Sequence, residues 1–368
     1  SYAGLQAEGV YGRAYWAMFE MRSDNTDQGL DATGLARQYT EINQFTESTL
    51  NEQVDAAWDN SYRVIANCNV ILDRIDGVEI EEGLKNRIIG EALFLRSLMY
   101  YHLAVAFGNI PLQLTPFAAG DELTQVDADA VYNQLVSDLT TAEGNLPISY
   151  PESDVGRATK GAAATLLAKV QLTLGNASEA ETVLRRIISD YNYELVPNYA
   201  DLWGPANENN VESIFEVQYI SGGIGQGSAL TNEFSPSGDL QTGQGFGRNR
   251  PTTALENAYE TGDQRFEISM GTTYINSEDE EIVQNHVRKY QSDPPTENDS
   301  DTNFVVFRYA DVLLMLAEAI GESSESYDLI NQVRTRAGLG DIDGTSPGSF
   351  QEKLVKERQV ELAFENHR

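Results

Sequence analysis

The sequence predicts a mainly α-helical protein, in which tetratricopeptide-like helical hairpins form a scaffold around a loop-rich, partly β central insertion. Three observations support this fold class. Apolar residues recur at helical spacing through the first two-fifths of the chain and again near its C-terminal end. Residues 160–190 have the pattern of two short helices joined by a tight turn. Residues 192–304, in contrast, are rich in Gly, Asn, Pro, Ser and Thr.

The N-terminal part is predicted to contain four helices before this hairpin. The third of them is followed by Gly108 and then by Pro111, which are normal helix stop signals. The segment 23–48 is polar and irregular, so we expect a long loop over the surface, and such a loop in a compact domain is usually functional or mobile. The four predicted helices span residues 3–21, 49–76, 83–107 and 127–144.

The hairpin at 160–190 gives the clearest local signal. Its first helix has apolar residues on one face, and Gly175 ends it. Ser178 and Glu181 predict a capping box for the second helix. Small residues recur where two helices of a tetratricopeptide repeat must touch, and one such unit needs neighbours to cover its apolar face. The repeat positions are Ala168, Gly175, Ala180 and Leu184, and the apolar face of the first helix is Ala163, Leu166, Leu167, Val170 and Leu174.

The rest of the chain divides into two parts. Alternation over residues 211–219 predicts a strand, and the glycines of 221–250 predict a loop. Helical periodicity returns at 305–320 and 325–338. We therefore expect one domain with three parts. These are a helical scaffold (1–191), a loop-rich insertion with short strands on the ligand side (192–304) and C-terminal helices that return to the scaffold (305–368).

Charge and cysteine content restrict the function. The chain has 57 Asp and Glu against 25 Lys and Arg, a net charge of -32, which repels phosphate backbones and makes nucleic acid a poor partner. The same charge favours a neutral glycan over an anionic one. The single cysteine, Cys68, lies in a helical pattern and is expected to be a small buried residue. No run of 18 apolar residues predicts a membrane span, and we expect both ends to be trimmed, so that a targeting signal could have been lost with them.

No motif predicts catalysis, a metal or a cofactor. The three histidines are widely separated, and neither HExxH nor GxSxG occurs. The alternating glycines near residues 225 and 245 do not follow a strand and open a helix, so dinucleotide binding is rejected. The segment from Asp299 begins like a calcium loop but lacks the turn glycine and the closing glutamate. With so many acidic residues, a glycosidase pair cannot be recognised from the sequence.

Four segments, in order, resemble the SusD/RagB family along nearly the whole chain. The first is WDNSYRVIANCNVILDRI, from Trp58, and the second is GEALFLRSLMYYHLAVAFGNIPL, from Gly90 to Leu112. The third is GRATKGAAATLLAKVQLTLG, from Gly156 to Gly175. The fourth comprises FRYADVLLMLAEAI, INQVRTRAGL and ERQVELAFENHR, from Phe307 to Arg368. These motifs are mostly structural, and their arginines are expected to tie helix ends and loops together: Arg96, Arg157, Arg308 and Arg358.

The resemblance implies a function at the cell surface. Members of the family are lipoproteins on the outer face of the outer membrane, and the lipid anchor, an N-terminal cysteine, is absent from this chain. They serve polysaccharide utilisation by capping a SusC-like TonB-dependent transporter and passing oligosaccharides to it. The tetratricopeptide-like face packs on the transporter, and the ligand lies on the opposite, loop-rich side. The resemblance thus implies non-catalytic binding of polysaccharide or oligosaccharide.

Candidate ligand-binding residues come from the two regions that the resemblance marks, 23–48 and 220–300. Aromatic rings stack on the apolar faces of sugars, and polar or charged side chains bond their hydroxyls. Neither region contains tryptophan, so stacking would fall to Tyr, Phe or the nearby Trp203. The candidates are Asn25, Asp27, Tyr39, Phe45, Trp203, Phe246, Arg248, Asn249, Arg250 and Tyr290, with Gln28 and Tyr274 in the same loops.

Three alternatives remain open. The same fold in the RagB branch captures peptides or glycopeptides, whose carboxylates Arg248 and Arg250 could meet bidentately. A surface glycoside hydrolase would release reducing sugar. A cytoplasmic tetratricopeptide adaptor is disfavoured, because such adaptors rarely need a long loop-rich insertion.

Overall fold

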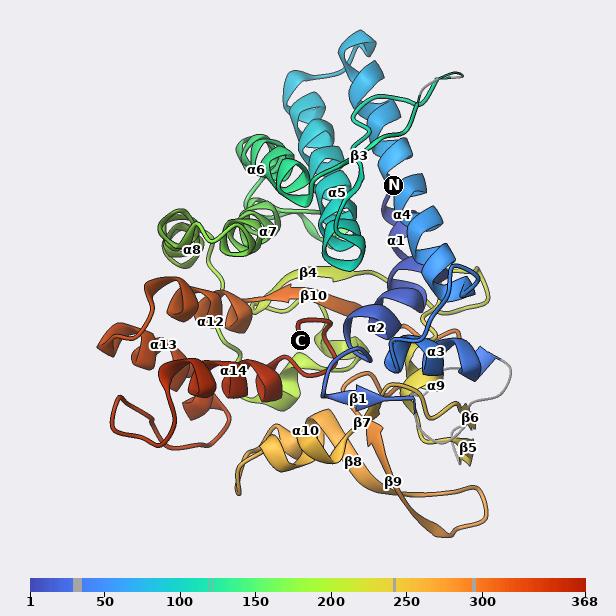
Figure 1. The fold of residues 1–368 in the computed structure, drawn as a ribbon, viewed down its shortest axis with the longest axis vertical. Coiled ribbons are helices and arrows are strands. Elements are labelled where there is room, and N and C mark those ends of the chain that lie inside the picture. Colours follow the sequence, from blue (N-terminus) through green and yellow to red (C-terminus); the bar gives the residue numbers. More distant parts are fainter. Residues whose placement is uncertain (29–34, 119, 121, 241–242, 293–295) are drawn as a thin grey trace.

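The computed structural model describes residues 1–368 except 29–34, 119, 121, 241–242 and 293–295. Helices dominate the described residues, which confirms the predicted fold class. Figure 1 shows the long N-terminal helices in the upper half and short strands, short helices and loops in the lower half.

The scaffold consists of helices that pack in chain order, each on the next. They are α4 (Glu52–Arg74), α5 (Glu82–Phe107), α6 (Ala128–Asn145), α7 (Lys160–Thr173) and α8 (Ala177–Asp190). Gly108 ends α5 with φ 71°, as its position predicted. The capping box predicted at Ser178 and Glu181 is wrong, because the N-cap of α8 is Asn176, two residues before Ser178, and it makes no side-chain cap.

The α7–α8 hairpin confirms the tetratricopeptide-like contact. Ala168, Ala180 and Leu184 are completely buried where the two helices meet. Gly175 makes the turn with φ 77°, a conformation that favours glycine. The C-terminal helix α12 (Tyr309–Ile320) packs against α8, so neighbouring elements cover the apolar face that one hairpin leaves open.

The N-terminal segment differs from prediction. Residues 3–21 do not form one helix but three pieces, α1 (Tyr2–Leu5), a π-helical turn (Glu8–Gly12) and α2 (Ala14–Phe19). The break falls at Val10, whose backbone is not helical. Gly9 explains it, because a Cβ there would lie 2.1 Å from the backbone oxygen of Ala56 in α4. The segment therefore bends to lie flat against α4.

Substitution of Gly9 tests this contact. Gly9→Ala is expected to lower the free energy of unfolding by about 1–3 kcal/mol, because the added methyl group meets backbone atoms that cannot rotate away. Gly144→Ala, in α6, is the matched control, since a Cβ there meets nothing within 4 Å. That variant should keep or slightly raise stability, by up to ~1 kcal/mol. Urea unfolding measures both, and equal effects of the two variants would contradict the close approach.

The segment 23–48 is also more ordered than predicted. It contains the strand β1 (Thr26–Asp27) and the helix α3 (Leu35–Asn43). The helix is held because Tyr39 stacks on Trp16 of α2, with ring centroids 5.0 Å apart and planes at 21°. The segment is mostly polar, so its sequence did not predict this buried aromatic contact.

The central insertion is bounded by an antiparallel strand pair. β4 (Ser213–Val217) confirms the predicted strand and pairs with β10 (Phe304–Arg308), Phe304 opposite Val217. Three further two-stranded pairs, besides one that β1 forms near the candidate site, are β2 (Ile110–Pro111) with β3 (Gln125–Val126), β5 (Gly238–Leu240) with β6 (Gly243–Gly245), and β8 (Met270–Ile275) with β9 (Glu281–Val287). The insertion also contains the short helices α9 (Leu230–Phe234), α10 (Thr253–Ala258) and α11 (Phe266–Ser269).

Short 3-10 turns connect elements in several parts of the chain. They occupy Ile75–Gly77, Glu152–Asp154, Tyr199–Leu202 and Pro205–Asn207.

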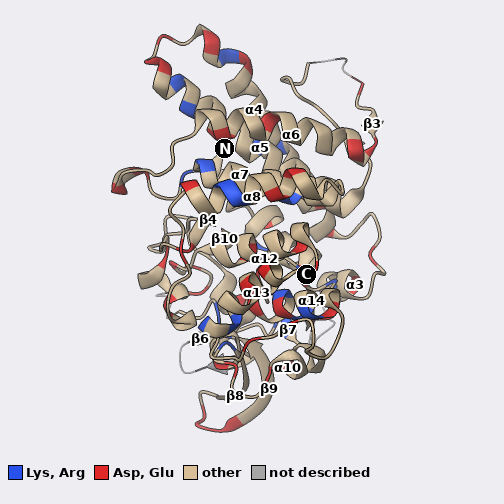
Figure 2. Cartoon of the chain, turned by 90° about the vertical axis from the view of Figure 1, so that its left-hand side faces the viewer, with Lys and Arg blue, Asp and Glu red and all other residues tan. Residues whose placement is uncertain are grey.

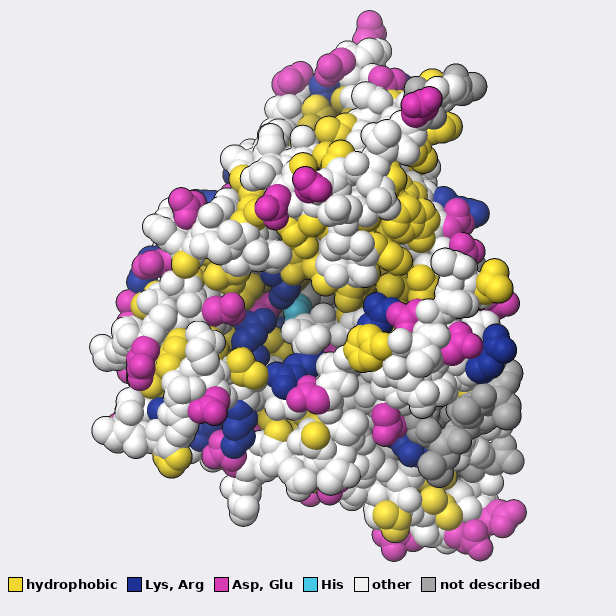
Figure 3. Space-filling view, viewed as in Figure 1, with side chains coloured by type: hydrophobic (Ala, Val, Ile, Leu, Met, Phe, Trp, Pro, Cys, Tyr) yellow, Lys and Arg dark blue, Asp and Glu magenta, His cyan; other side chains and the backbone are white. Residues whose placement is uncertain are grey.

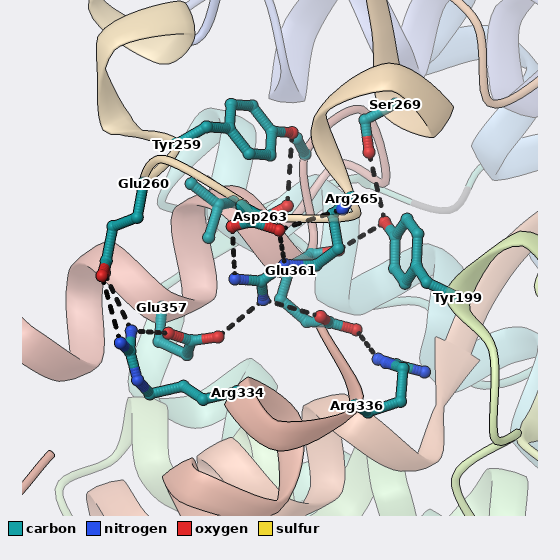
Figure 4. A network of polar contacts seen from close by, with 12 residues as sticks. Tyr199, Tyr259, Glu260, Asp263, Arg265, Ser269, Arg334, Arg336, Glu357 and Glu361 are labelled. Carbon is teal, nitrogen blue, oxygen red and sulfur yellow. Dashed lines mark hydrogen bonds and ion pairs between the residues drawn. The ribbon is translucent and has the colours of Figure 1, made fainter. Parts of the chain in front are cut away.

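The C-terminal helices are tied to the insertion by buried ion pairs. After α12 come α13 (Ser324–Arg336) and α14 (Phe350–Glu361). Figure 4 shows Arg265 between Glu357 and Glu361 of α14, at nitrogen–oxygen distances of 2.6 and 2.9 Å. Arg308, at the end of β10, bonds the same Glu361. Basic side chains of the insertion and of the C-terminal part thus meet at one buried carboxylate.

The core extends through the scaffold and under the insertion. Helix α5 is long and apolar enough to cross a membrane, but 72% of its apolar stretch is buried in the fold, which is typical of a core helix. Cys68 is buried, as predicted, and burial raises the pKa of its thiol. His102 packs among aromatic rings and burial lowers its pKa to about 3. Figure 2 shows acidic residues spread over loops and helix ends along the molecule.

The face seen in Figure 3 is hollowed at its centre. Apolar side chains gather above the hollow, over the helical half, and basic side chains surround a histidine inside it. Two small cavities, of about 240 and 140 Å³, have His367 and Arg368 in common among their lining residues.

Candidate functional site

A larger open cavity, of about 820 Å³, lies in the lower half of the molecule. Three segments that are far apart in the sequence meet around it. They are β1 at the start of the segment 23–48, the segment 244–253 around β7 (Arg250–Pro251), and strand β9. The volume lies within the usual range of ligand sites, about 300–1,000 Å³.

Backbone pairing fixes the first two segments relative to each other. β1 pairs antiparallel with β7, Asp27 opposite Arg250. The hydroxyl of Thr26 donates to Oδ1 of Asn249 at 2.7 Å. Asn249 has φ 51°, a conformation that Asn tolerates better than most residues, and this brings Arg248 and Arg250 to the cavity wall.

Helix α9 supports the aromatic part of the wall. The backbone N–H of Phe246 donates to the carbonyl of Asn232 at 2.8 Å, and that of Arg248 to the carbonyl of Glu233 at 2.9 Å. Phe246 is half-buried and its ring lies in the cavity wall. The Arg248 guanidinium lies 5.1 Å from the centroid of that ring, within cation–π distance. The ring is therefore in contact with a charged side chain of the same wall.

Arg248 is itself neutralised. It forms an ion pair with the buried Glu233, which also pairs with Arg13 at 2.9 Å. On its other side the guanidinium lies 4.9 Å from the ring of Tyr39. Burial, followed by the charge of Glu233, raises the pKa of the Tyr39 hydroxyl, so Tyr39 stays neutral. Arg248 thus holds the site together more than it offers free charge.

Arg250 is the more available cation. Its Nε lies 3.7 Å from Oδ1 of Asp27, a longer ion pair than those of Arg248. The side chains of Arg250 and Asp27 are 17% and 46% exposed. Both face the cavity, so a donor and an acceptor of opposite charge stand together at its edge.

Strand β9 completes the cavity with amides. Gln284 accepts from the backbone N–H of Ser237 at 3.3 Å, and Asn285 donates to Glu256 at 3.1 Å. Val283, 82% exposed, offers an apolar surface beside them. An aromatic ring, planar amides and an arginine–carboxylate pair are the groups that bind the C–H faces and the hydroxyls of sugars. Within the described residues, no group of three or more His, Cys, Asp or Glu is placed to hold a metal ion.

The structure brings four of the ten candidate residues to this cavity, Asp27, Phe246, Arg248 and Arg250. Asn249 is completely buried behind the wall, where it accepts from Thr26. Asn25 is also buried, because its amide donates to Glu20 and its carbonyl oxygen accepts from Gln359. These two residues position the loops and do not reach the cavity.

The other aromatic candidates lie elsewhere. Tyr39 is in the core against Trp16, and Tyr290 stacks on Phe304 with ring planes at 7°. Trp203 is buried with the Lys289 ammonium 4.6 Å from its ring centroid. Phe45 is 67% exposed but does not line the cavity. Burial removes the first three from contact with a surface ligand, so the structure corrects their expected stacking role.

Sequence reasoning missed most of the polar wall. Gln28, which was noted in the first loop, does line the cavity, whereas Tyr274 bonds the carbonyl of Ser237 at 3.0 Å. Gln244, Gln284 and Asn285 were not singled out, although all lie in the region 220–300. The alternation of β9 could have indicated Asn285 alone, because Val283 and Asn285 share one face of a strand whereas Gln284 lies on the other.

Comparison with known proteins decides the family. Residues 2–172 match the family described as "Starch-binding associating with outer membrane", and residues 264–368 match the SusD family. The chain belongs to the SusD/RagB family. A curated member, SusD-like protein P2 of Formosa agariphila, is 28% identical over 99% of this chain and 80% of its own length.

Solved structures of SusD-like proteins agree with this fold. A laminarin binding SusD-like protein superposes with a TM-score of 0.87 at 28% identity, covering 100% of this chain and 87% of its own. Surface glycan-binding protein A from Bacteroides thetaiotaomicron, in complex with laminarihexaose, has a TM-score of 0.85 at 20% identity, with 100% and 86% coverage. At that identity the second likeness shows the SusD-like fold alone.

Proposed function

We propose that this SusD-like protein binds polysaccharide or oligosaccharide at the outer membrane surface, without chemistry, through the cavity around Phe246. One observation carries the proposal. The Phe246 ring, the amides of β9 and the Arg250–Asp27 pair share one open cavity. Such a wall can stack on a pyranose and bond its hydroxyls at the same time. The family's association with the outer membrane and with starch binding supports the same reading.

A neutral glycan is the favoured ligand class. The net charge of -32 raises the local concentration of cations and repels polyanions. Within the cavity Arg248 is neutralised by Glu233, and Arg250 faces Asp27. A laminarin binding protein is among the structural relatives at 28% identity, so a laminarin-type glucan is the first ligand to test.

The proposal includes delivery to a SusC-like TonB-dependent transporter by an outward-facing lipoprotein. The family resemblance implies both the anchor and the partner. Figure 3 shows apolar side chains over the helical half. The α5 residue Val105 is 48% exposed. The cavity lies in the other half of the molecule, so a glycan could be held while the helical face is occupied.

A peptide or glycopeptide ligand is the second candidate, and Arg250 favours it. Its ion pair with Asp27, at 3.7 Å, is long enough that a ligand carboxylate could compete for the guanidinium. A peptide carrying a free C-terminus or acidic side chains would make that contact, whereas a neutral glycan would not.

Calorimetry against a panel of soluble polysaccharides tests the proposal. The panel contains laminarin, other neutral glycans, anionic glycans and a pool of peptides, and products of each mixture are analysed. We expect saturable binding of a neutral glycan without release of reducing sugar. If peptides bound and no glycan did, the cavity would be assigned to a peptide or glycopeptide ligand instead. Release of reducing sugar would show a glycoside hydrolase.

A further inference from the structure

A second groove, of about 620 Å³, lies far from the cavity around Phe246. One bank is the segment 193–197, and the other is α13. Figure 1 places α13 on the left of the molecule and the strands β5 and β6, next to the first cavity, on the right. No lining residue is shared between the two cavities, so they can be occupied independently.

The banks of this groove are fixed by the fold. The Tyr193 ring lies against Gly161, where a Cβ would be 2.3 Å from the Tyr193 hydroxyl oxygen, and that hydroxyl bonds Thr159 at 3.1 Å. On the other bank the Asn331 amide bonds both the N–H and the carbonyl of Ile342, each at 2.9 Å. The groove therefore exists before any ligand binds, which lowers the ordering cost of binding.

The groove combines apolar and polar surface. Tyr193, Leu195, Pro197 and Tyr309 supply aromatic and aliphatic contacts. Asp328, Gln332 and Thr335 stand in one row on α13, at the spacings of three and four residues that place side chains on the same face. Asp328 and Gln332 are exposed, and among the described residues neither side chain bonds another side chain.

The floor adds a buried donor. Arg336 uses its two terminal nitrogens on Glu212 and Glu361, so its charge is neutralised. Its Nε is buried and has no hydrogen-bond partner within the described part of the chain. An unpaired buried N–H is costly, and an oxygen acceptor in the groove would relieve that cost.

We propose that this groove is a second binding site for neutral oligosaccharide, and this inference rests on the proposed function. A hydroxyl can donate to the Asp328 carboxylate and accept from the Gln332 amide or from Arg336. Glu194, Asp328 and Asp341 line the groove with no free cation among its residues, so anionic sugars are repelled. The tyrosines and Pro197 provide the apolar contact that a sugar ring needs.

Two sites on one molecule change how long polysaccharides are held. Segments of one chain, or of two chains in a branched network, could occupy both cavities, and the second contact would be intramolecular. A long polysaccharide should then bind more tightly than a hexasaccharide of the same linkage, although each site alone is weak.

The test uses a groove-filling variant, Gln332→Trp, with Asn133→Trp as its matched control. Asn133 is an exposed residue of α6 outside both cavities, so the control adds the same indole without blocking the groove. Phe246→Ala combined with Arg250→Ala weakens the first cavity. Laminarihexaose, laminarin, hexasaccharides of each glycan bound in the panel and a lysine-rich peptide are titrated by calorimetry into the wild type and each variant.

We expect the first-cavity variant to retain weak hexasaccharide binding, and addition of Gln332→Trp to weaken that remainder at least tenfold. Gln332→Trp alone should reduce the preference for long over short glucan, and Asn133→Trp should not. Loss of all binding in the first-cavity variant overturns the second site and leaves the proposed function standing. Absence of glycan binding to the wild type removes both. Loss of peptide binding alone in Gln332→Trp would assign the groove to a basic peptide and overturn the oligosaccharide site.

Discussion

Replacement of Arg308 by methionine is expected to lower the free energy of unfolding by about 3–5 kcal/mol. The guanidinium is buried and bonds three carboxylates, at 2.7 Å to Glu365, 2.9 Å to Glu212 and in a shorter contact to Glu361. It also donates to the backbone carbonyl of Glu361 at 2.5 Å. Methionine fills part of the space but leaves buried acids without their shared cation. Denaturant unfolding followed by circular dichroism measures the loss.

Arg185→Met is the matched control for this variant. Arg185 also forms a bidentate ion pair, with Glu325 at 2.6 and 3.0 Å, but both side chains are nearly half exposed. Water and salt screen such a pair, so its removal should leave stability almost unchanged. An equal loss in the two variants would show that burial does not set the cost.

The acid dependence of stability separates charge from packing. Burial alone would raise the pKa of Glu361, but Arg336, Arg308 and Arg265 outweigh it and hold that pKa well below the usual range. The carboxylate therefore stabilises the fold above the pKa of an unfolded glutamate, about 4.3, and this contribution is lost as the pH falls below it. The difference between wild type and Glu361→Gln should be largest near neutral pH and should narrow in acid. A constant difference would indicate lost packing instead.

The helical scaffold could be predicted because its signal is local. In α7 and α8 the apolar residues repeat along one face, and glycine marks the turn. The prediction of one helix over residues 3–21 was wrong because of a contact between residues far apart in the sequence. Gly9 meets the backbone of Ala56, 47 positions further along, and the helix breaks where the two segments touch. Tyr39 and Trp16 hold α3 in the same non-local way.

The site was predicted in part, and for different reasons at each residue. Arg250 reaches the cavity because β7 pairs with β1, and Phe246 because α9 holds its backbone. The family resemblance marked both loops but did not predict these contacts. Tyr290 and Trp203 lie in equally polar stretches, yet they are buried. The sequence shows that a loop contains an aromatic residue, but it does not show whether the ring points into the core or toward solvent. The positions of the β9 amides depend on how β9 pairs with β8, and the sequence alone did not predict that register.

Phe246→Ala is expected to weaken binding of the glycan at least tenfold, about 1.4 kcal/mol. The ring lies in the cavity wall, backed by Arg248, so its removal takes away the flat apolar surface on which a pyranose can stack. Arg248 stays held by Glu233, and the fold should keep its stability. Calorimetry with the glycan found in the panel measures the change, and Phe246→Tyr, which keeps the ring, should bind nearly as wild type.

Phe45→Ala is the matched control, because it deletes an exposed phenylalanine near the first loop that does not line the cavity. Its affinity should equal that of the wild type. Both candidates came from the regions that the family resemblance marks, and only the structure separates them. If Phe45→Ala weakened binding as much as Phe246→Ala, the glycan would have to extend beyond the cavity to the end of α3. If Phe45→Ala alone weakened it, the cavity around Phe246 would lose its assigned role.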